Sequence, residues 1–293
     1  MTFDMPFLIL SVLCSVLVSV LLKLAQRRGL AMPAILFWNY VIAVLLCAWW
    51  LDPPLQRLHE AVTPWPALLL LAVLLPTIFL AMAASVKAAG IVRTDVAQRL
   101  SLVVSLLAAF AWFGESADAM KLFGLGLGVL AIPAIVSRSR CESAGEQRRA
   151  WGLPLAVLFG YAAVDILLKH IAAAGTPFAA SLFVAFCGAL LIMLCVLMVA
   201  RSRGGLRLDR GSLLFGLLVG ASNFANILFY IKAHRALPDN PAVVFATMNL
   251  GVVVLGTLVG VFVFREKLAR LNLVGIALAI VAVTIIATRL AAG

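Results

Sequence analysis

One lysine motif occurs twice in this chain, each time at the end of a long apolar stretch. Residues 21–23 read Leu-Leu-Lys and are followed by Gly29, and residues 167–169 repeat Leu-Leu-Lys and are followed by Gly175. The two copies are 146 residues apart in a chain of 293. Each closes an apolar segment long enough to cross a bilayer. This spacing predicts two copies of one membrane unit, and we expect the function to lie between them.

The composition also predicts a membrane protein. Hydrophobic residues make up 65% of the chain, charged residues only 12%, and the mean hydropathy is +1.14. Soluble domains average roughly 45–50% apolar and about 25% charged residues. The apolar runs are continuous and about 20 residues long, which is typical of membrane helices and not of a barrel. Residues 1–4 lack the basic start of a cleavable signal peptide. We therefore predict an all-α integral membrane protein that contacts the lipid bilayer.

Net charge and cysteine content indicate neither a nucleic-acid-binding protein nor a metal-binding protein. The formal charge is +11, but the basic residues lie in short loops between the apolar runs, so we expect no nucleic acid as a partner. The five cysteines are scattered, and no CxxC spacing or other metal-ligand pattern is present. We expect neither a metal site nor a cofactor.

Glycines, prolines and short polar loops divide the apolar sequence into ten runs. The predicted membrane helices lie at about residues 6–25, 33–51, 66–86, 94–114, 119–137, 151–172, 177–199, 211–231, 241–264 and 269–289.

Further landmarks extend the repeat. Lys87 and Lys232 end the third and eighth predicted helices, 145 residues apart. A Glu-x8-Gly pair begins at Glu115 after the fourth helix and at Glu266 after the ninth, 151 residues apart. Ordered matches anchored on rare charged residues indicate a duplication.

The duplication defines the predicted organisation. A first five-helix repeat covers residues 1–137, a cytoplasmic linker residues 138–150, and a second five-helix repeat residues 151–293. Because five is odd, the second repeat starts on the opposite side of the membrane and is inverted. Inverted repeats are typical of secondary transporters, whose substrate site lies at the repeat interface near the bilayer midplane.

The distribution of lysine and arginine predicts the orientation. The side reached after odd-numbered helices holds 17 of the 23 basic residues. Basic residues favour the cytoplasmic side. Both termini are therefore predicted to be extracytoplasmic, in a multi-pass protein of a bacterial inner membrane.

Ten helices in a 5+5 duplication resemble the drug/metabolite transporter superfamily, in its EamA-type branch. The residues that carry this resemblance are Lys23 and the two Glu-x8-Gly pairs, Glu115 with Gly124 and Glu266 with Gly275. It covers about residues 6–289. Members of this branch resemble exporters of amino acids and related metabolites, so the resemblance implies export of such solutes.

Polar side chains inside the predicted helices are the candidates for a substrate cavity, because each is costly in hydrocarbon. The candidate residues are Ser15, Ser19, Asn39, Gln98, Tyr161, Asp165, Asn223, Asn226, Tyr230 and Asn249.

Asp165 is the deepest ionisable residue, and two interpretations stay open. It could bind a proton or a substrate amine. Alternatively, it could pair with Lys169 four residues later on the same helix face and only fix the helix.

The uncharged candidates also have two interpretations, as residues that line a cavity or as residues that join helices. Ser15 and Ser19 share a stripe with Ser11 that either lines the cavity or packs helices. Asn223, Asn226 and Tyr230 lie on one face of the eighth helix, in its outer half. Gln98 and Asn249 are matched amides of the two repeats. Each amide either faces the cavity or bonds a neighbouring helix, because it cannot stay unpaired in hydrocarbon.

Charged residues near the helix ends have simple structural interpretations. Arg93, Asp95 and Arg99 form either a solvated or snorkelling cluster at the cytoplasmic start of the fourth helix or an inner gate. Lys23 suits the dipole at the end of its helix.

The favoured function is a secondary transporter that exports small, zwitterionic metabolites, most of all amino acids, by alternating access. One alternative is a multidrug or cationic-compound exporter, although this chain lacks the central glutamate expected of one. The other is a passive facilitator or lipid scramblase. An enzyme is not expected, since no nucleophile–base pair is present.

Glycine pairs such as Gly124-x3-Gly128 and Gly256-x3-Gly260 predict close helix packing. The fifth and tenth helices are predicted to buttress the bundle or to form a homodimer.

Overall fold

The computed structural model describes residues 5–59, 63–113, 119–136, 144–203, 209–236 and 241–291. Within these ranges the chain is helical, as predicted, and contains ten α-helices and no strand. The elements are α1 (Met5–Arg27), α2 (Met32–Leu51), the 3₁₀ turn η1 (Leu55–His59), α3 (Trp65–Ala89), α4 (Ile91–Phe113), α5 (Ala119–Val136), α6 (Ala144–Ala173), α7 (Phe178–Ser202), α8 (Arg210–Ala236), α9 (Pro241–Leu258), the π turn η2 (Val259–Val263) and α10 (Arg270–Ala291).

Most helix ends lie within three residues of their predicted positions, and three differ by more. α6 begins at Ala144 rather than 151, and α8 continues to Ala236 rather than 231. In both cases the helix continues past the end of the apolar run, because an apolar run follows the depth of hydrocarbon rather than the hydrogen bonding of the backbone. α9 ends at Leu258, before the predicted 264, because the backbone changes to a π turn.

The end of α9 positions a carboxylate. After η2, Arg265 adopts a left-handed φ of 54°, which turns the chain. The amide of Glu266 then donates a hydrogen bond of 2.9 Å to the carbonyl of Gly260. Glu266 is thereby held against the bundle instead of extending the helix.

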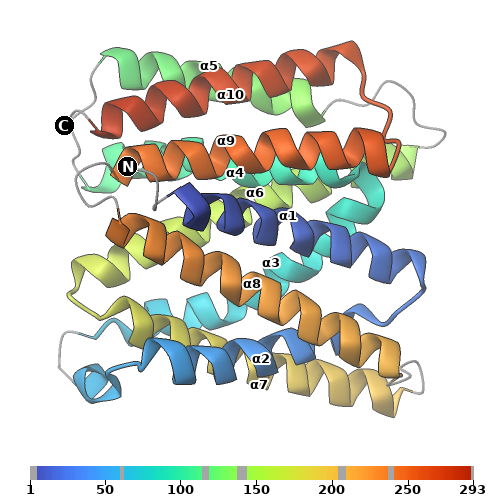
Figure 1. Cartoon of the computed structure of the whole chain (residues 1–293), viewed down its shortest axis with the longest axis vertical. Helices are drawn as coiled ribbons and strands as arrows, with labels where there is room; N and C mark the ends of the chain where they lie inside the picture. The colour runs from blue at the N-terminus through green and yellow to red at the C-terminus, as the bar shows by residue number, and fades with distance from the viewer. Residues whose placement is uncertain are drawn as a thin grey trace.

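Among the described residues, six helices are individually long and apolar enough to span a membrane: α1, α2, α3, α6, α7 and α8. Shorter apolar segments lie in α5, α9 and α10, at Leu122–Ala134, Thr247–Val263 and Arg270–Ile286. The sequence of α4 is less apolar because it contains Arg93, Asp95 and Arg99. All these helices run side by side in one bundle (Figure 1).

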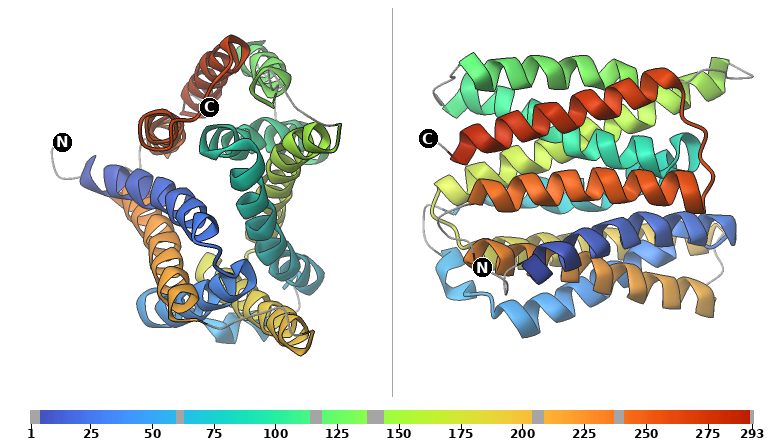
Figure 2. Two further views of the ribbon diagram at one scale, coloured as in Figure 1. Left: turned by 90° about the vertical axis from the view of Figure 1, so that its right-hand side faces the viewer. Right: turned by 45° about the horizontal axis from the view of Figure 1, so that its top comes forward.

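Helix contacts occur in matched pairs. α5 packs on α10 at one edge of the bundle and α2 on α7 at the other (Figures 1 and 2). Between these edges α1 packs on α8 as α6 packs on α3, and α9 packs on α1 as α4 packs on α6. If each helix number is shifted by five, the contact between α1 and α8 becomes the contact between α6 and α3, and the other named contacts correspond in the same way. The contacts therefore have the pattern of two related five-helix halves.

Glycines bring helices together, as predicted. A β-carbon at Gly220 of α8 would lie 2.8 Å from the backbone oxygen of Asn39 on α2. One at Gly128 of α5 would lie 2.4 Å from the side chain of Val103 on α4. Gly256 of α9 and Gly260 of η2 make room for groups of α4 and for Glu266. α5 and α10 buttress the bundle by packing on each other and on α4 and α9, and the homodimer stays a prediction.

Candidate functional site

Arg99, in the middle part of α4, is the centre of a polar cluster inside the bundle. Its Nη2 donates to the Ser15 hydroxyl on α1 at 2.8 Å, and its Nη1 donates to Asn249 Oδ1 on α9 at 3.4 Å. Its Nε is buried without a hydrogen-bond partner. A guanidinium presents five donors in a fixed fork and remains charged in proteins. The cluster therefore holds a permanent cation with an unused donor.

Two carboxyl groups flank Arg99, and their surroundings differ. Asp165 on α6 is an exposed residue and accepts a 3.2 Å hydrogen bond from Ser101 of α4. Asp95, one helical turn before Arg99, is only 2% exposed and accepts a 2.7 Å bond from Ser19 of α1. Both carboxyl groups are within electrostatic range of Arg99. Asp165 is thus the accessible acid of the cluster, and Asp95 is the enclosed one.

Tyr161 on α6 and Tyr230 on α8 complete the surroundings of Arg99. Both phenols interact electrostatically with the guanidinium, and both are only partly buried. The Tyr161 hydroxyl also contacts the Met82 sulfur at 3.4 Å, and the Tyr230 ring lies 4.5 Å from that of His234. The cluster therefore combines α1, α4, α6, α8 and α9, which come from both halves of the chain.

Asn226 belongs to a second polar contact, between α1 and α8. The Ser11 hydroxyl donates to Asn226 Oδ1 at 2.9 Å and also lies 3.1 Å from the Asn226 carbonyl. The serine stripe of α1 therefore bonds two different helices: α8 through Ser11, and α4 through Ser15 (to Arg99) and Ser19 (to Asp95).

Some of the predicted site residues do not belong to the cluster around Arg99. Asn39 is fully buried between α2 and α8, with neither amide atom hydrogen-bonded. Gln98 and Asn223 are half-buried residues of α4 and α8, and the structure does not join them to the contacts of Arg99. Asp165 accepts a hydrogen bond from Ser101, which joins α6 to α4.

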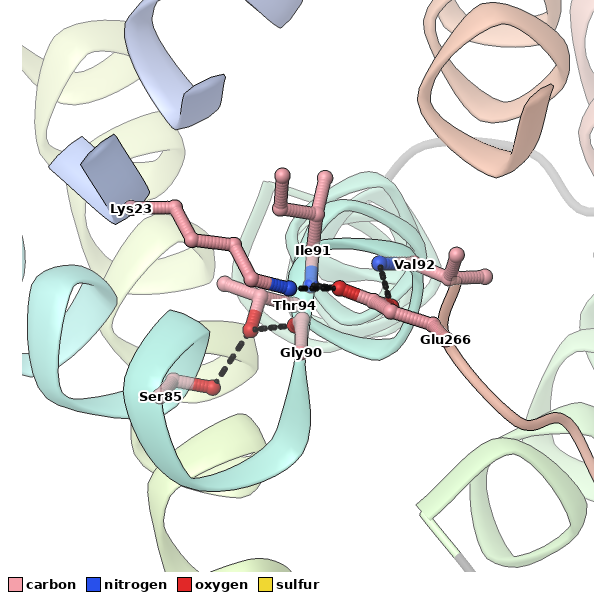
Figure 3. Close-up of polar contacts among 7 residues, drawn as sticks. All are labelled: Lys23, Ser85, Gly90, Ile91, Val92, Thr94 and Glu266. Carbon is pink, nitrogen blue, oxygen red and sulfur yellow. Dashed lines mark hydrogen bonds and ion pairs between the residues drawn. The ribbon is translucent and has the colours of Figure 1, made fainter. Parts of the chain in front are cut away.

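One end of the bundle, which we call the Lys23 end, is closed by a second set of polar contacts. The Lys23 ammonium of α1 forms an ion pair with the Glu266 carboxylate (Figure 3). The same carboxylate accepts hydrogen bonds from the first amides of α4, Ile91 at 2.7 Å and Val92 at 3.2 Å. A carboxylate at a helix N-terminus satisfies unpaired amides and complements the helix dipole.

Gly90 allows this approach. Its φ of 93° lies in the left-handed region, and a β-carbon there would be 2.6 Å from Glu266 Oε2. The Thr94 hydroxyl bonds the Gly90 carbonyl at 2.8 Å and the Ser85 hydroxyl at 2.7 Å, which ties α4 to α3 (Figure 3). Glu266 therefore holds α1, the α3–α4 turn and the end of α9 together.

A surface pocket of about 460 Å³ lies beside this ion pair. Its charged lining residues are Lys23, Lys87, Arg93, Glu266 and Lys267. Arg93 is 5% exposed and donates to Asn272 Oδ1 at 3.2 Å. Arg93 and Asp95 are both buried, so these two side chains are not solvated at the surface of the bundle.

Sequence reasoning missed the central position of Arg99 and the capping by Glu266. The signal for Arg99 was its depth, two turns inside α4 in a sequence where charges are rare. The signal for Glu266 was its place in the repeated Glu-x8-Gly pair, which indicated duplication without indicating the partner. Glu115, the other member of that repeat, lies outside the described residues. The described residues contain no group of His, Cys, Asp and Glu that could hold a metal ion.

The polar cluster around Arg99 and Asp165 thus draws on helices from both halves of the chain. Residues 3–137 match the EamA-like transporter family. An uncharacterized protein of Haemophilus influenzae is 38% identical over 275 residues, which are 92% of this chain and 93% of that protein. A protein of known crystal structure has the same fold, with a TM-score of 0.60, 18% identity and coverage of 98% of this chain and 99% of the other.

The chain is therefore a multi-pass membrane protein and a member of the EamA-like transporter family. This membership confirms the resemblance drawn from Lys23 and the Glu-x8-Gly pairs. Members of this family are transporters, which indicates transport of small solutes across a membrane.

Proposed function

We propose that this protein is a secondary transporter that exports zwitterionic metabolites, above all amino acids, across a bacterial inner membrane. Transport would follow alternating access between two inverted five-helix repeats that together cross the membrane ten times. The Lys23 end would be cytoplasmic, as the excess of lysine and arginine on that side favours. The matched helix contacts support the repeats.

The observation that carries the substrate class is Arg99 and Asp165 in one cluster. An amino acid presents a carboxylate and an ammonium group a few ångströms apart. Arg99 offers an unused donor for the carboxylate, and Asp165, an exposed acid on the facing helix, offers an acceptor for the ammonium. Charge-assisted hydrogen bonds of this kind are stronger than neutral ones. A central guanidinium would repel the substrates of a cation exporter, which weighs against that alternative.

The contacts also support a specific state of the cycle. At the Lys23 end, Val92, Val96 and Asp95 are at most 2% exposed, and Glu266 joins the elements around them. Asp165, nearer the other end, is exposed. This arrangement suits a conformation closed toward the cytoplasm, from which substrate leaves on the opposite side.

Counterflow in proteoliposomes tests the proposal. Vesicles loaded with an unlabelled amino acid would take up the same labelled amino acid, with aromatic, branched, hydroxyl and sulfur-containing substrates compared in parallel. We expect saturable exchange for a subset of these substrates, loss of exchange in Asp165→Asn, and normal exchange in Asp209→Asn, which changes an exposed acid just before α8. Absence of exchange for every amino acid would contradict the substrate class, and uptake without saturation would favour a passive facilitator.

A further inference from the structure

The side chain of Asp95 is enclosed without an adequate set of partners for a carboxylate. It is 2% exposed, and its Oδ1 accepts one hydrogen bond, from the hydroxyl of Ser19, which is also 2% exposed. Its Oδ2 is buried with no hydrogen-bond partner. The Oδ2 atom faces α9, where a β-carbon at Gly256 would lie 2.7 Å away.

No cation among the described residues pairs with Asp95. Arg99 lies on the same helix, but its Nη2 and Nη1 bond Ser15 and Asn249, and its Nε bonds no residue. From α1 the nearest cation along the chain is Lys23, which pairs with Glu266. α9 contains no charged residue between Pro241 and Leu258.

The other titratable groups around Asp95 do not provide a cation either. They are Glu266 after η2, whose charge has the same sign, and the phenol of Tyr161 on α6. Arg93, two residues before Asp95, bonds Asn272. An ionised carboxyl group would therefore depend on one hydroxyl and on the more distant charge of Arg99.

A buried, unpaired carboxylate costs several kcal/mol, and in proteins such a group takes up a proton instead. Resting on the export function proposed above, we propose that Asp95 is the proton-binding site that couples transport to the pH gradient. Asp95 holds a proton while the Lys23 end is closed. When that end opens, water reaches the carboxyl group, which ionises and releases the proton to the cytoplasm.

The position of Asp95 links its protonation to this movement. Its one hydrogen-bond partner, Ser19, is on α1, and its unpaired Oδ2 faces Gly256 of α9; these two helices meet α4 beside the Lys23–Glu266 ion pair. Separating these helices removes the enclosure and hydrates the carboxyl group in one step. In the closed state a proton from the opposite side can reach Asp95 through the polar groups around Arg99, one helical turn away. One proton would thus move inward for each substrate that moves outward.

Two transport assays on the same vesicles test this site. With the vesicle interior about one pH unit more acidic than the outside, and the membrane potential held at zero by equal potassium concentrations and valinomycin, one-to-one proton exchange drives up to about tenfold substrate accumulation. We expect this accumulation in the wild type and in Asp209→Asn. In Asp95→Asn we expect none above equilibration, together with counterflow at a rate similar to the wild type, since counterflow needs no net proton movement.

The outcomes separate the two proposals. Saturable counterflow in the wild type without accumulation under a pH gradient, or normal accumulation in Asp95→Asn, would overturn the proton site and leave the export function intact. Absence of wild-type counterflow would overturn the export function itself.

If Asp95→Asn is inactive in both assays, infrared spectroscopy of the purified protein tests the proton site. We expect the band of a protonated carboxylic acid near neutral pH in the wild type and in Asp165→Asn, and its loss in Asp95→Asn. Persistence of the band in Asp95→Asn would overturn the assignment.

Discussion

Lys23 and Glu266 form an ion pair although 243 residues separate them in the chain. The side chains are only 14% and 11% exposed, and the Lys23 ammonium lies 4.6 Å from the centre of the Phe264 ring. Because Glu266 also caps α4, it has more partners than Lys23 has. The two residues should therefore contribute unequally to the closed Lys23 end.

The first prediction compares Glu266→Gln with Lys23→Met. Glu266→Gln should lower the free energy of unfolding by about 3 kcal/mol, as expected for breaking a partly buried ion pair. Lys23→Met should lower the free energy of unfolding by less, because Glu266 still accepts the hydrogen bonds from the amides of Ile91 and Val92. Thermal unfolding in detergent measures both. An equal or larger cost for Lys23→Met would mean that the cap on α4 contributes little.

The second prediction concerns opening of the same end. Val96 of α4 is fully buried, so a cysteine at this position in a cysteine-free background should react slowly with a water-soluble maleimide. Adding Glu266→Gln should increase the rate several-fold, because opening becomes easier. The matched control adds Glu60→Gln, a change of the same kind elsewhere in the chain, and should not alter the rate. Unchanged labelling with Glu266→Gln would show that the ion pair does not control access.

The third prediction concerns substrate recognition by Arg99. Arg99→Lys should weaken substrate binding in counterflow by at least about tenfold, because lysine keeps the charge but loses the fork that reaches Ser15 and Asn249. Methyl esters of good substrates, which lack the carboxylate, should compete poorly with the wild type. The control Arg57→Lys changes an exposed arginine of η1 and should have no effect. Full activity of Arg99→Lys, or strong competition by esters, would remove Arg99 from the substrate site.

The helices could be predicted from sequence because apolar length and punctuation follow directly from bilayer thickness and backbone chemistry. The partners of polar residues could not. Ser19 and Asp165 lie 146 residues apart, the spacing of the repeated lysine motif, and each bonds α4, but the sequence only showed that each needed a partner. The most specific helical pattern, Asp165 four residues before Lys169, suggested a contact within α6, whereas the structure shows a contact between helices. Which polar residues meet depends on helix rotation, and apolar residues on all sides of a membrane helix give little information about rotation.

The fourth prediction compares two glycines in helices. Gly220→Ala should destabilise the protein by about 1–3 kcal/mol, because the new methyl group meets the backbone of α2, which cannot move aside easily. Gly126→Ala on α5 meets nothing within 4 Å and should be neutral or stabilising by up to about 1 kcal/mol, since alanine favours helix. Thermal unfolding of both variants checks the order. Equal effects would indicate that α2 and α8 pack less closely than the structure shows.

The fifth prediction uses the buried amide of Asn39. Neither amide atom has a hydrogen-bond partner, so the folded protein bears a desolvation cost of about 1–3 kcal/mol for this side chain. Asn39→Val removes the amide, and should raise the unfolding temperature in detergent and leave counterflow unchanged. Asn39→Asp should lower the unfolding temperature strongly, because it can place a charge in the same apolar surroundings. Loss of counterflow in a well-folded Asn39→Val protein would instead return Asn39 to the substrate site, with its amide reserved for the ligand.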